Sequence, residues 1–235
     1  MDRLEQYLSK QPLKQFQNER GSLLLRDVAY KRLKDAIRHA DLQPGQPLSE
    51  SRLSKLLGIS RTPIREALHM LAQDGLINMS PGQTVTVASH SVRDVLDVVH
   101  IRALLEPELV RLIARTMPQR GIEELFAVME EMETAAAEND KATWSKADTR
   151  FHEILSEHSP NGLLGETILH LRNRVHHLAN IDSETNPDRL AACTQEHRVI
   201  VEAIAARDGQ AAEQAMHAHI RALRESLFAR LSYGL

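Results

Sequence analysis

The sequence is poor in several of the residues and segments that mark common classes of protein. It contains one cysteine, Cys193, so no disulfide can form within the chain, which is compatible with a reducing cytoplasm. No apolar run approaches the ~18 residues that a bilayer span needs, and no basic-then-apolar signal segment opens the chain. Aromatic residues make up 3% of the chain, whereas alanine, leucine, glutamate and arginine are plentiful, which favours helices over sheets. We therefore expect a cytoplasmic, mostly α-helical protein without a membrane partner.

Charge and histidine are unevenly distributed along the 235 residues. Residues 1–80 carry 13 Lys and Arg against 9 Asp and Glu, whereas residues 81–235 carry 16 against 23. Ten of the twelve histidines follow residue 80. A chain of this length commonly forms two domains. A mildly basic half and an acidic half rich in side chains that can bind metal suggest two separate tasks.

Three short helices and a β-hairpin are predicted in the basic half. Apolar residues recur at helical spacing between residues 28 and 40, and DLQPGQP then breaks the helix. A second helix begins at Ser49, which can cap its free amides, and stops at Gly58. The third begins around residues 60–62, and NMSPGQTVTV after it is typical of a small hairpin. This order is that of a winged helix-turn-helix domain, whose second motif helix can enter a DNA major groove.

The first turn of the third helix carries the residues that we expect to contact DNA. Its apolar residues recur at i, i+3/i+4 and i+7 and must face the core, so the polar residues between them face outward. These outward residues are Ser60, Arg61, Thr62 and Arg65. Arginine can bond guanine in bidentate fashion or hold a phosphate, and hydroxyls and helix-start amides add phosphate contacts. The alternative is a solubilising face on a small helical domain.

The stretch LQPGQPLSESRLSKLLGISRTPIREALHMLAQDGLI closely resembles the N-terminal domain of the GntR family of bacterial transcription regulators, and SRTPIREAL is quite specific to that family. The resemblance implies that Arg61, Thr62 and Arg65 contact base edges in the DNA groove or backbone phosphates. It places Gly82 at the wing tip near the minor groove. The family often has an arginine at the position of Ser51. Here the arginine is the next residue, Arg52, which we include among the DNA-binding candidates.

Past the ASHSVRD connection, the chain is expected to be helical almost to its end. The predicted helices span 94–116, 121–138, 141–158, 161–180, 188–207 and 209–231. Short connections between them indicate an antiparallel bundle. The predicted segments are therefore a mobile arm at 1–22, in which LEQYLSK could form a short helix, a winged helix-turn-helix domain at 23–88, a linker at 89–93 and an all-helical domain at 94–235.

One aspartate and three histidines of the bundle are candidates for a metal site. Asp148 and His152 are four residues apart and project from one face of one helix. His197 and His219 lie on apolar faces of two further helices. One carboxylate and three imidazoles suit a divalent transition metal, with Zn²⁺ preferred over Ni²⁺ and Mn²⁺. Any one of these histidines could instead be a core or surface residue. We expect the remaining ones, His158, His170, His176, His177 and His217, to be surface or interface residues.

The acidic half resembles the FCD ligand-binding domain of the FadR subfamily of GntR regulators. The match is carried by IRALLEP, ADTRFHEIL, SPNGLLGETILHLRNR, QEHRVIVEAI and HAHI. The resemblance implies metal ligation by Asp148, His152, His197 and His219, and a small organic acid lying on the metal. For the second anchor of that effector we expect Arg102, because guanidinium grips carboxylate in bidentate fashion, with Arg172 and Arg174 as weaker candidates.

The sequence thus predicts a homodimeric transcriptional regulator rather than an enzyme. Two winged domains would meet two half-sites of double-stranded operator DNA, and the bound acid would change their affinity for it. A metal-dependent hydrolase is one alternative, because an Asp/His₃ centre with an open position could activate water. A regulator that senses the metal ion itself is another, and a purely structural metal is a third.

Overall fold

The structure, a computed structural model, describes residues 3–9, 24–39, 42–80, 82–89, 91–185 and 187–233, with side chains in these ranges except at 9, 38–39, 92, 174–188 and 230–233. The chain forms two compact units, Met1–His90 and Ser91–Leu235. None of the described helices is long and apolar enough to cross a membrane. The predicted class, a winged helix-turn-helix followed by an all-α domain, is confirmed.

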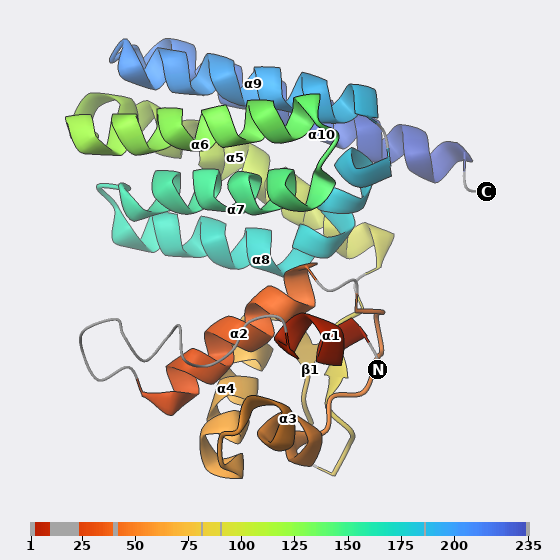
Figure 1. The fold of residues 1–235 in the computed structure, drawn as a ribbon. Coiled ribbons are helices and arrows are strands. Elements are labelled where there is room, and N and C mark those ends of the chain that lie inside the picture. Colours follow the sequence, from red (N-terminus) through yellow and green to blue (C-terminus); the bar gives the residue numbers. More distant parts are fainter. Residues whose placement is uncertain are drawn as a thin grey trace. The chain divides into compact units, whose positions relative to one another are not determined.

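The N-terminal unit contains four helices and a short antiparallel hairpin among its described residues (Figure 1). The elements are α1 (Arg3–Ser9), α2 (Leu25–His39), α3 (Glu50–Leu57), α4 (Arg61–Gln73), β1 (Ile77–Asn78) and β2 (Thr86–Val87). In the hairpin, Ile77 lies opposite Val87. Pro47 adds an isolated bridge to Thr86, so the chain before α3 also packs on the wing, which the sequence did not indicate.

Helix α3 begins after Ser49 and ends at Gly58, as the sequence predicts. The Ser49 hydroxyl accepts a hydrogen bond from the Arg52 amide and caps the helix start. Gly58 ends it with φ 64°, a left-handed conformation that glycine adopts without steric cost, and its N–H donates to the carbonyl of Ser54. Leu53 and Leu57 are fully buried, so both the cap signals and the apolar spacing fix this helix.

Part of the predicted mobile arm is folded. Residues 3–9 form α1, the short helix allowed for in LEQYLSK, and Leu4 and Leu8 are buried in the core of the N-terminal unit. Arg32 of α2 donates from Nη2 to the carbonyl oxygen of Leu8 at 2.7 Å. A seven-residue helix is too short for a periodic pattern to stand out, and its burial depends on α2 and α3. Residues 10–22 of the expected arm lie outside the described residues.

The C-terminal unit is a bundle of helices (Figure 1). They are α5 (Val92–Thr116), α6 (Gln119–Ala137), α7 (Lys141–Glu157), α8 (Gly162–Thr185), α9 (Pro187–Ala205) and α10 (Gly209–Tyr233). Each overlaps the predicted helix closely, because its ends carry local stop signals. Ser91 and Asp94, for example, form a capping box at the start of α5.

Helix α7 packs against α6 and α8, and its Trp144 side chain reaches α9. Trp144 and Phe151 are among the largest fully buried side chains, and the Trp144 indole donates from Nε1 to Thr194 Oγ1 of α9 at 2.8 Å. On its other side α7 approaches α8 closely, since a Cβ added at Gly165 would lie 2.4 Å from the carbonyl oxygen of Ser156. The backbone of α8 can come this near only because residue 165 has no side chain. The side chains that α7 carries are therefore held in place from two directions.

Candidate nucleic-acid interface and metal centre

The leading end of α4 presents the predicted DNA-contact residues to solvent. The exposed residues there are Ser60, Arg61, Thr62 and Arg65, and the buried ones are Ile64, Ala67, Leu68 and Leu71. Ser60 precedes the first helical residue, and its hydroxyl makes no capping bond. The amides of this first turn and the hydroxyl are thus available to an anion such as a phosphate.

The Arg65 side chain is paired with Glu50 of α3. Its Nε donates to Glu50 Oε1 at 3.0 Å, and its Nη2 donates to Glu50 Oε2 at 2.8 Å. The hydrogen bond from Arg65 lowers the pKa of Glu50, and the same bond raises the pKa of Arg65. The carboxylate occupies one edge of the guanidinium and leaves Nη1 on the other, so Glu50 holds Arg65 in one orientation. No signal in the sequence pointed to this partner on α3.

The two remaining DNA candidates lie on other elements. Arg52, on α3, is exposed and places Nη2 3.4 Å from Glu5 Oε2 of α1. Gly82, between the two strands, has φ 74°, and a Cβ added there would meet no other atom within 4 Å. The wing tip is therefore open at this residue.

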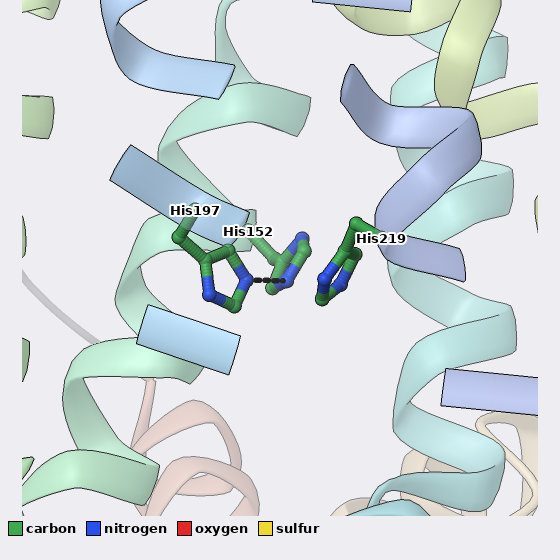
Figure 2. A group of neighbouring side chains, drawn as sticks. All are labelled: His152, His197 and His219. Carbon is green, nitrogen blue, oxygen red and sulfur yellow. Dashed lines mark hydrogen bonds between the residues drawn. The ribbon is translucent and has the colours of Figure 1, made fainter. Parts of the chain in front are cut away.

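The four predicted metal ligands come from three helices and are all buried. Asp148 and His152 lie on α7, His197 on α9 and His219 on α10. One ring nitrogen from each histidine lies within 4.8 Å of the others, and the three rings face one another in Figure 2. Asp148 Oδ1 lies 3.6 Å from His152 Nε2 and 3.5 Å from His197 Nε2.

These separations fit a metal ion bound by the group. In a tetrahedral zinc site with bonds of about 2.0–2.1 Å, ligand atoms lie about 3.3 Å apart. His197 Nε2 and His152 Nε2 are 3.2 Å apart, and both oxygen–nitrogen distances to Asp148 Oδ1 are close to that spacing. In the metal-free structure His197 Nε2 and His152 Nε2 share a hydrogen bond (Figure 2), and a cation in its place would compensate the buried carboxylate. Geometry and donor chemistry therefore agree.

The protonation of the group also suits a metal. Burial lowers the pKa of His152 to about 4 and that of His197 well below its usual range, so both imidazoles are neutral at neutral pH. Burial acts to raise the pKa of Asp148, but its interactions with His152 and Arg172 hold it well below the ordinary value. His152, His197 and Asp148 thus offer two neutral imidazoles and an ionised carboxylate, the forms that ligate metals.

Arg102, the first predicted effector anchor, is already paired. It is buried, and its Nε donates to Glu106 Oε1 at 2.6 Å, one turn along α5. Burial acts to raise the pKa of Glu106, but Arg102 and Arg172 lower it strongly. The i, i+4 spacing in IRALLEP could have revealed this pair.

Arg172 lies closer to the metal ligands. Its Nη2 donates to Asp148 Oδ2 at 3.4 Å. Its Nη1 lies 3.6 Å from Glu106 Oε1 and makes no hydrogen bond to any described residue. Burial lowers its pKa to about 10, so it stays charged. Arg172 is thus in contact with a predicted ligand, Asp148, whereas the side chain of Arg174 lies outside the described residues.

Among the other histidines, His217 is exposed, and His158 is partly buried with Nδ1 2.9 Å from the carbonyl oxygen of Ile154. His170 is partly buried, and the side chains of His176 and His177 lie outside the described part of the chain. Sequence reasoning missed the groups around the ligands: Glu106, Cys193 and Glu196. Cys193 Sγ lies 3.8 Å from His197 Nδ1, and burial raises the pKa of its thiol.

Both units match known protein families. Residues 25–87 match the family model of bacterial regulatory proteins of the gntR family, and residues 97–222 match the FCD domain. The chain is 30% identical to the uncharacterized HTH-type transcriptional regulator YdhC of Bacillus subtilis (strain 168), across 81% of this chain and 85% of that protein. It is 29% identical to the HTH-type transcriptional repressor RspR of Escherichia coli (strain K12), across 84% and 86%. The solved structure of E. coli McbR/YncC has a TM-score of 0.79 at 23% identity and covers 89% of this chain and 99% of that one, which shows a shared fold.

Proposed function

The chain belongs to the GntR family of bacterial regulatory proteins and carries an FCD domain. From this premise we propose that the protein binds operator DNA as a homodimer. We propose further that a small carboxylate, bound at a metal site in the C-terminal unit, changes the affinity for the operator. Family membership makes the protein a DNA-binding transcriptional regulator and not an enzyme. The observation that carries the proposal is the approach of three buried imidazoles from α7, α9 and α10 to one another, with Asp148 beside those of His152 and His197.

Asp148, His152, His197 and His219 would hold a divalent transition metal, preferably Zn²⁺, with Ni²⁺ or Mn²⁺ as alternatives. When bound, such an ion supplies a coordination position for a carboxylate oxygen. The support from this chain is the ligand-like spacing of His152 Nε2, His197 Nε2 and Asp148 Oδ1, together with their buried, unprotonated state.

Arg172 is the group that we assign to the effector's other carboxylate oxygen. Its Nη1 makes no hydrogen bond within the described residues and lies 3.6 Å from Glu106 Oε1, so a carboxylate bound there would displace an ion pair and not a hydrogen bond. Glu106 and Asp148 flank the guanidinium, and an incoming carboxylate would compete with both for it. Glu106 lies on α5, the helix that follows the DNA-binding unit directly in the chain. Binding that alters the Arg172–Glu106 pairing would therefore act on α5.

A second copy of the chain is the proposed partner of the bundle. Ile101 and Leu104 lie one turn apart on α5, and Leu104 is 66% exposed. Large apolar side chains gathered on one exposed helix face are typical of an interface. Two DNA-binding units in one dimer would contact two half-sites related by twofold symmetry.

On DNA, the first turn of α4 would make the contacts. Ser60, Arg61, Thr62 and Arg65 are the proposed groove and phosphate residues. Arg52 and Gly82 are proposed to contact the flanking backbone and the minor groove. Arg65→Ala should weaken operator binding and reduce the dependence of log affinity on log salt by about one unit if Arg65 holds a phosphate. Lys31→Ala, an exposed charge on α2, is the matched control.

The experiment that tests the effector site compares His219→Asn with His217→Asn, two residues apart on α10. His219 is buried in the site, and His217 is exposed. Metal content is measured by elemental analysis, subunit number by native mass spectrometry, and affinity by fluorescence anisotropy on DNA selected by the protein from a random pool.

The wild type and His217→Asn should each retain one metal per chain, and a set of small carboxylates should include one that changes their DNA affinity by about 5–150-fold. His219→Asn should lose the metal and the response. A His219→Asn protein that keeps both would contradict the proposal. A response to metal alone, with no acid adding to it, would favour the metal-sensing alternative.

A further inference from the structure

An acidic side chain of α9 faces one of the candidate ligands from outside the ligand group. Glu196 Oε2 lies 2.7 Å from His219 Nδ1 of α10. Glu196 is itself held by Arg189, two turns earlier on α9, which donates from Nη1 to Oε1 at 2.5 Å and from Nη2 to Oε2 at 3.2 Å. Arg189 and His219 are buried, and the Glu196 side chain is 22% exposed. Arg189 therefore holds the Glu196 carboxylate in the orientation in which it contacts the His219 imidazole.

We propose that Glu196 is a positioning residue for His219. An ionised carboxylate can only accept, so in the neutral form of the His219 ring the 2.7 Å contact places the proton on Nδ1. The remaining lone pair is then on Nε2, which becomes the nitrogen of His219 that can ligate. Arg189 sets the direction from which Glu196 accepts, and the order of contacts runs from Arg189 through Glu196 to His219.

The proposal rests on the proposed metal site, and it adds residues that the four-ligand pattern does not contain. Carboxylates that accept from the far nitrogen of a metal-bound histidine orient the ring and fix its tautomer. One competing arrangement is visible. Ligand atoms of Cys193, Glu196 and His219 also lie within 4.8 Å of one another, so Glu196 could instead bind a metal directly with the thiol. Because Arg189 already engages both oxygens of Glu196, the positioning role fits the contacts better.

The test uses the full chain and Co²⁺ as the probe, with four variants for binding and a fifth, His219→Asn, for spectral assignment. Glu196→Ala removes the acceptor, whereas Glu196→Gln keeps an amide oxygen that can accept from Nδ1. Arg189→Met/Glu196→Leu removes both charges together and serves if the alanine variant does not fold. Glu202→Ala, an exposed acid on the same helix, is the matched control.

We expect Glu196→Ala to weaken Co²⁺ binding by about 10–100-fold, Glu196→Gln to recover most of the loss, and Glu202→Ala to bind as the wild type does. Long-range ¹H–¹⁵N spectra of histidine-labelled, metal-free protein should show His219 as the Nδ1–H tautomer in the wild type and lose that preference in Glu196→Ala. His219→Asn provides the assignment.

Unchanged affinity and an unchanged His219 tautomer in Glu196→Ala would overturn the proposal. A thiolate-to-cobalt absorption band in the Co²⁺-loaded wild type would also overturn it, because Cys193 and Glu196 would then be metal ligands. If the wild type takes up no Co²⁺, the proposed metal function fails, whereas the tautomer measurement still decides whether Glu196 positions His219.

Discussion

Replacing Arg102 with methionine distinguishes a structural arginine from an effector anchor. In the structure, Arg102 Nε lies 2.6 Å from Glu106 Oε1, and the two side chains are 3% and 1% exposed. Methionine has similar length and no charge, so Arg102→Met leaves the Glu106 carboxylate buried with a weaker partner. Only Arg172 remains near it among the described arginines, at 3.6 Å.

The expected loss of stability follows from this geometry. Removing one partner of a buried ion pair costs about 3–5 kcal/mol. Because Arg172 retains part of the attraction, we expect about 3 kcal/mol for Arg102→Met, at the lower end of that range. At about 3–4 °C per kcal/mol for a unit of this size, the midpoint of thermal unfolding should fall by about 10 °C. Arg102→Met/Glu106→Leu removes both charges and should recover much of that loss.

Trp144 makes the measurement specific to the C-terminal unit. It is the chain's one tryptophan, is buried on α7 and donates a hydrogen bond to Thr194 of α9, so its fluorescence reports unfolding of this unit. A single variant as stable as the wild type, or a double variant no better than the single one, would refute the reasoning. If Arg102→Met kept its stability but lost the response to every carboxylate, Arg102 would be the anchor after all.

Three further predictions concern the metal, pH and DNA. Zn²⁺ at about 100 times its Kd should raise the free energy of unfolding by about 2.7 kcal/mol, seen by calorimetry with and without a chelator; no difference would argue against a metal site. In the metal-free protein the pKa of His152 falls from 6.5 to about 4 on folding, so the unfolded chain takes up this proton first, and the stability present above pH ~6.5 should decline between pH ~6.5 and ~4. Urea unfolding across that range should show the decline, and His152→Asn should flatten it. Glu50→Gln releases Arg65 and removes a negative charge beside the DNA-contact residues, so binding to random DNA should tighten and the ratio of specific to random affinity should fall. An unchanged ratio in anisotropy titrations would mean that Glu50 does not orient Arg65 on DNA.

Much of the fold could be predicted because its signals are local. Ser49 and Gly58 bound α3 through a side-chain cap and a left-handed residue, both visible within a few positions of sequence. The bundle helices end at similar signals, and their apolar faces repeat every three to four residues. From the sequence, α1 could be predicted only as a possibility. Its two buried leucines pack against α2 and α3, which are distant in the sequence.

The candidate site was predictable only in part. Asp148 and His152 share a face by spacing alone, and His197 and His219 were candidates because they lie on apolar helix faces. The resemblance to FCD domains implied that the four form one ligand set. The groups around them could not be found in this way. Arg172 meets Glu106 across α8 and α5, and Glu196 meets His219 across α9 and α10. Such pairs depend on how two packed helices are shifted and rotated relative to each other. No short sequence motif encodes that arrangement.

Gly165 has a consequence for the chemistry of the C-terminal unit although it bears no functional group. It lies seven residues, two turns, before Arg172 on α8, at the point where the helix touches the Ser156 carbonyl of α7. Any side chain there would force the two backbones apart and carry the guanidinium away from the carboxylates that flank it. The spacing of these opposite charges therefore depends on the absence of a Cβ at residue 165, where α8 touches the backbone of α7.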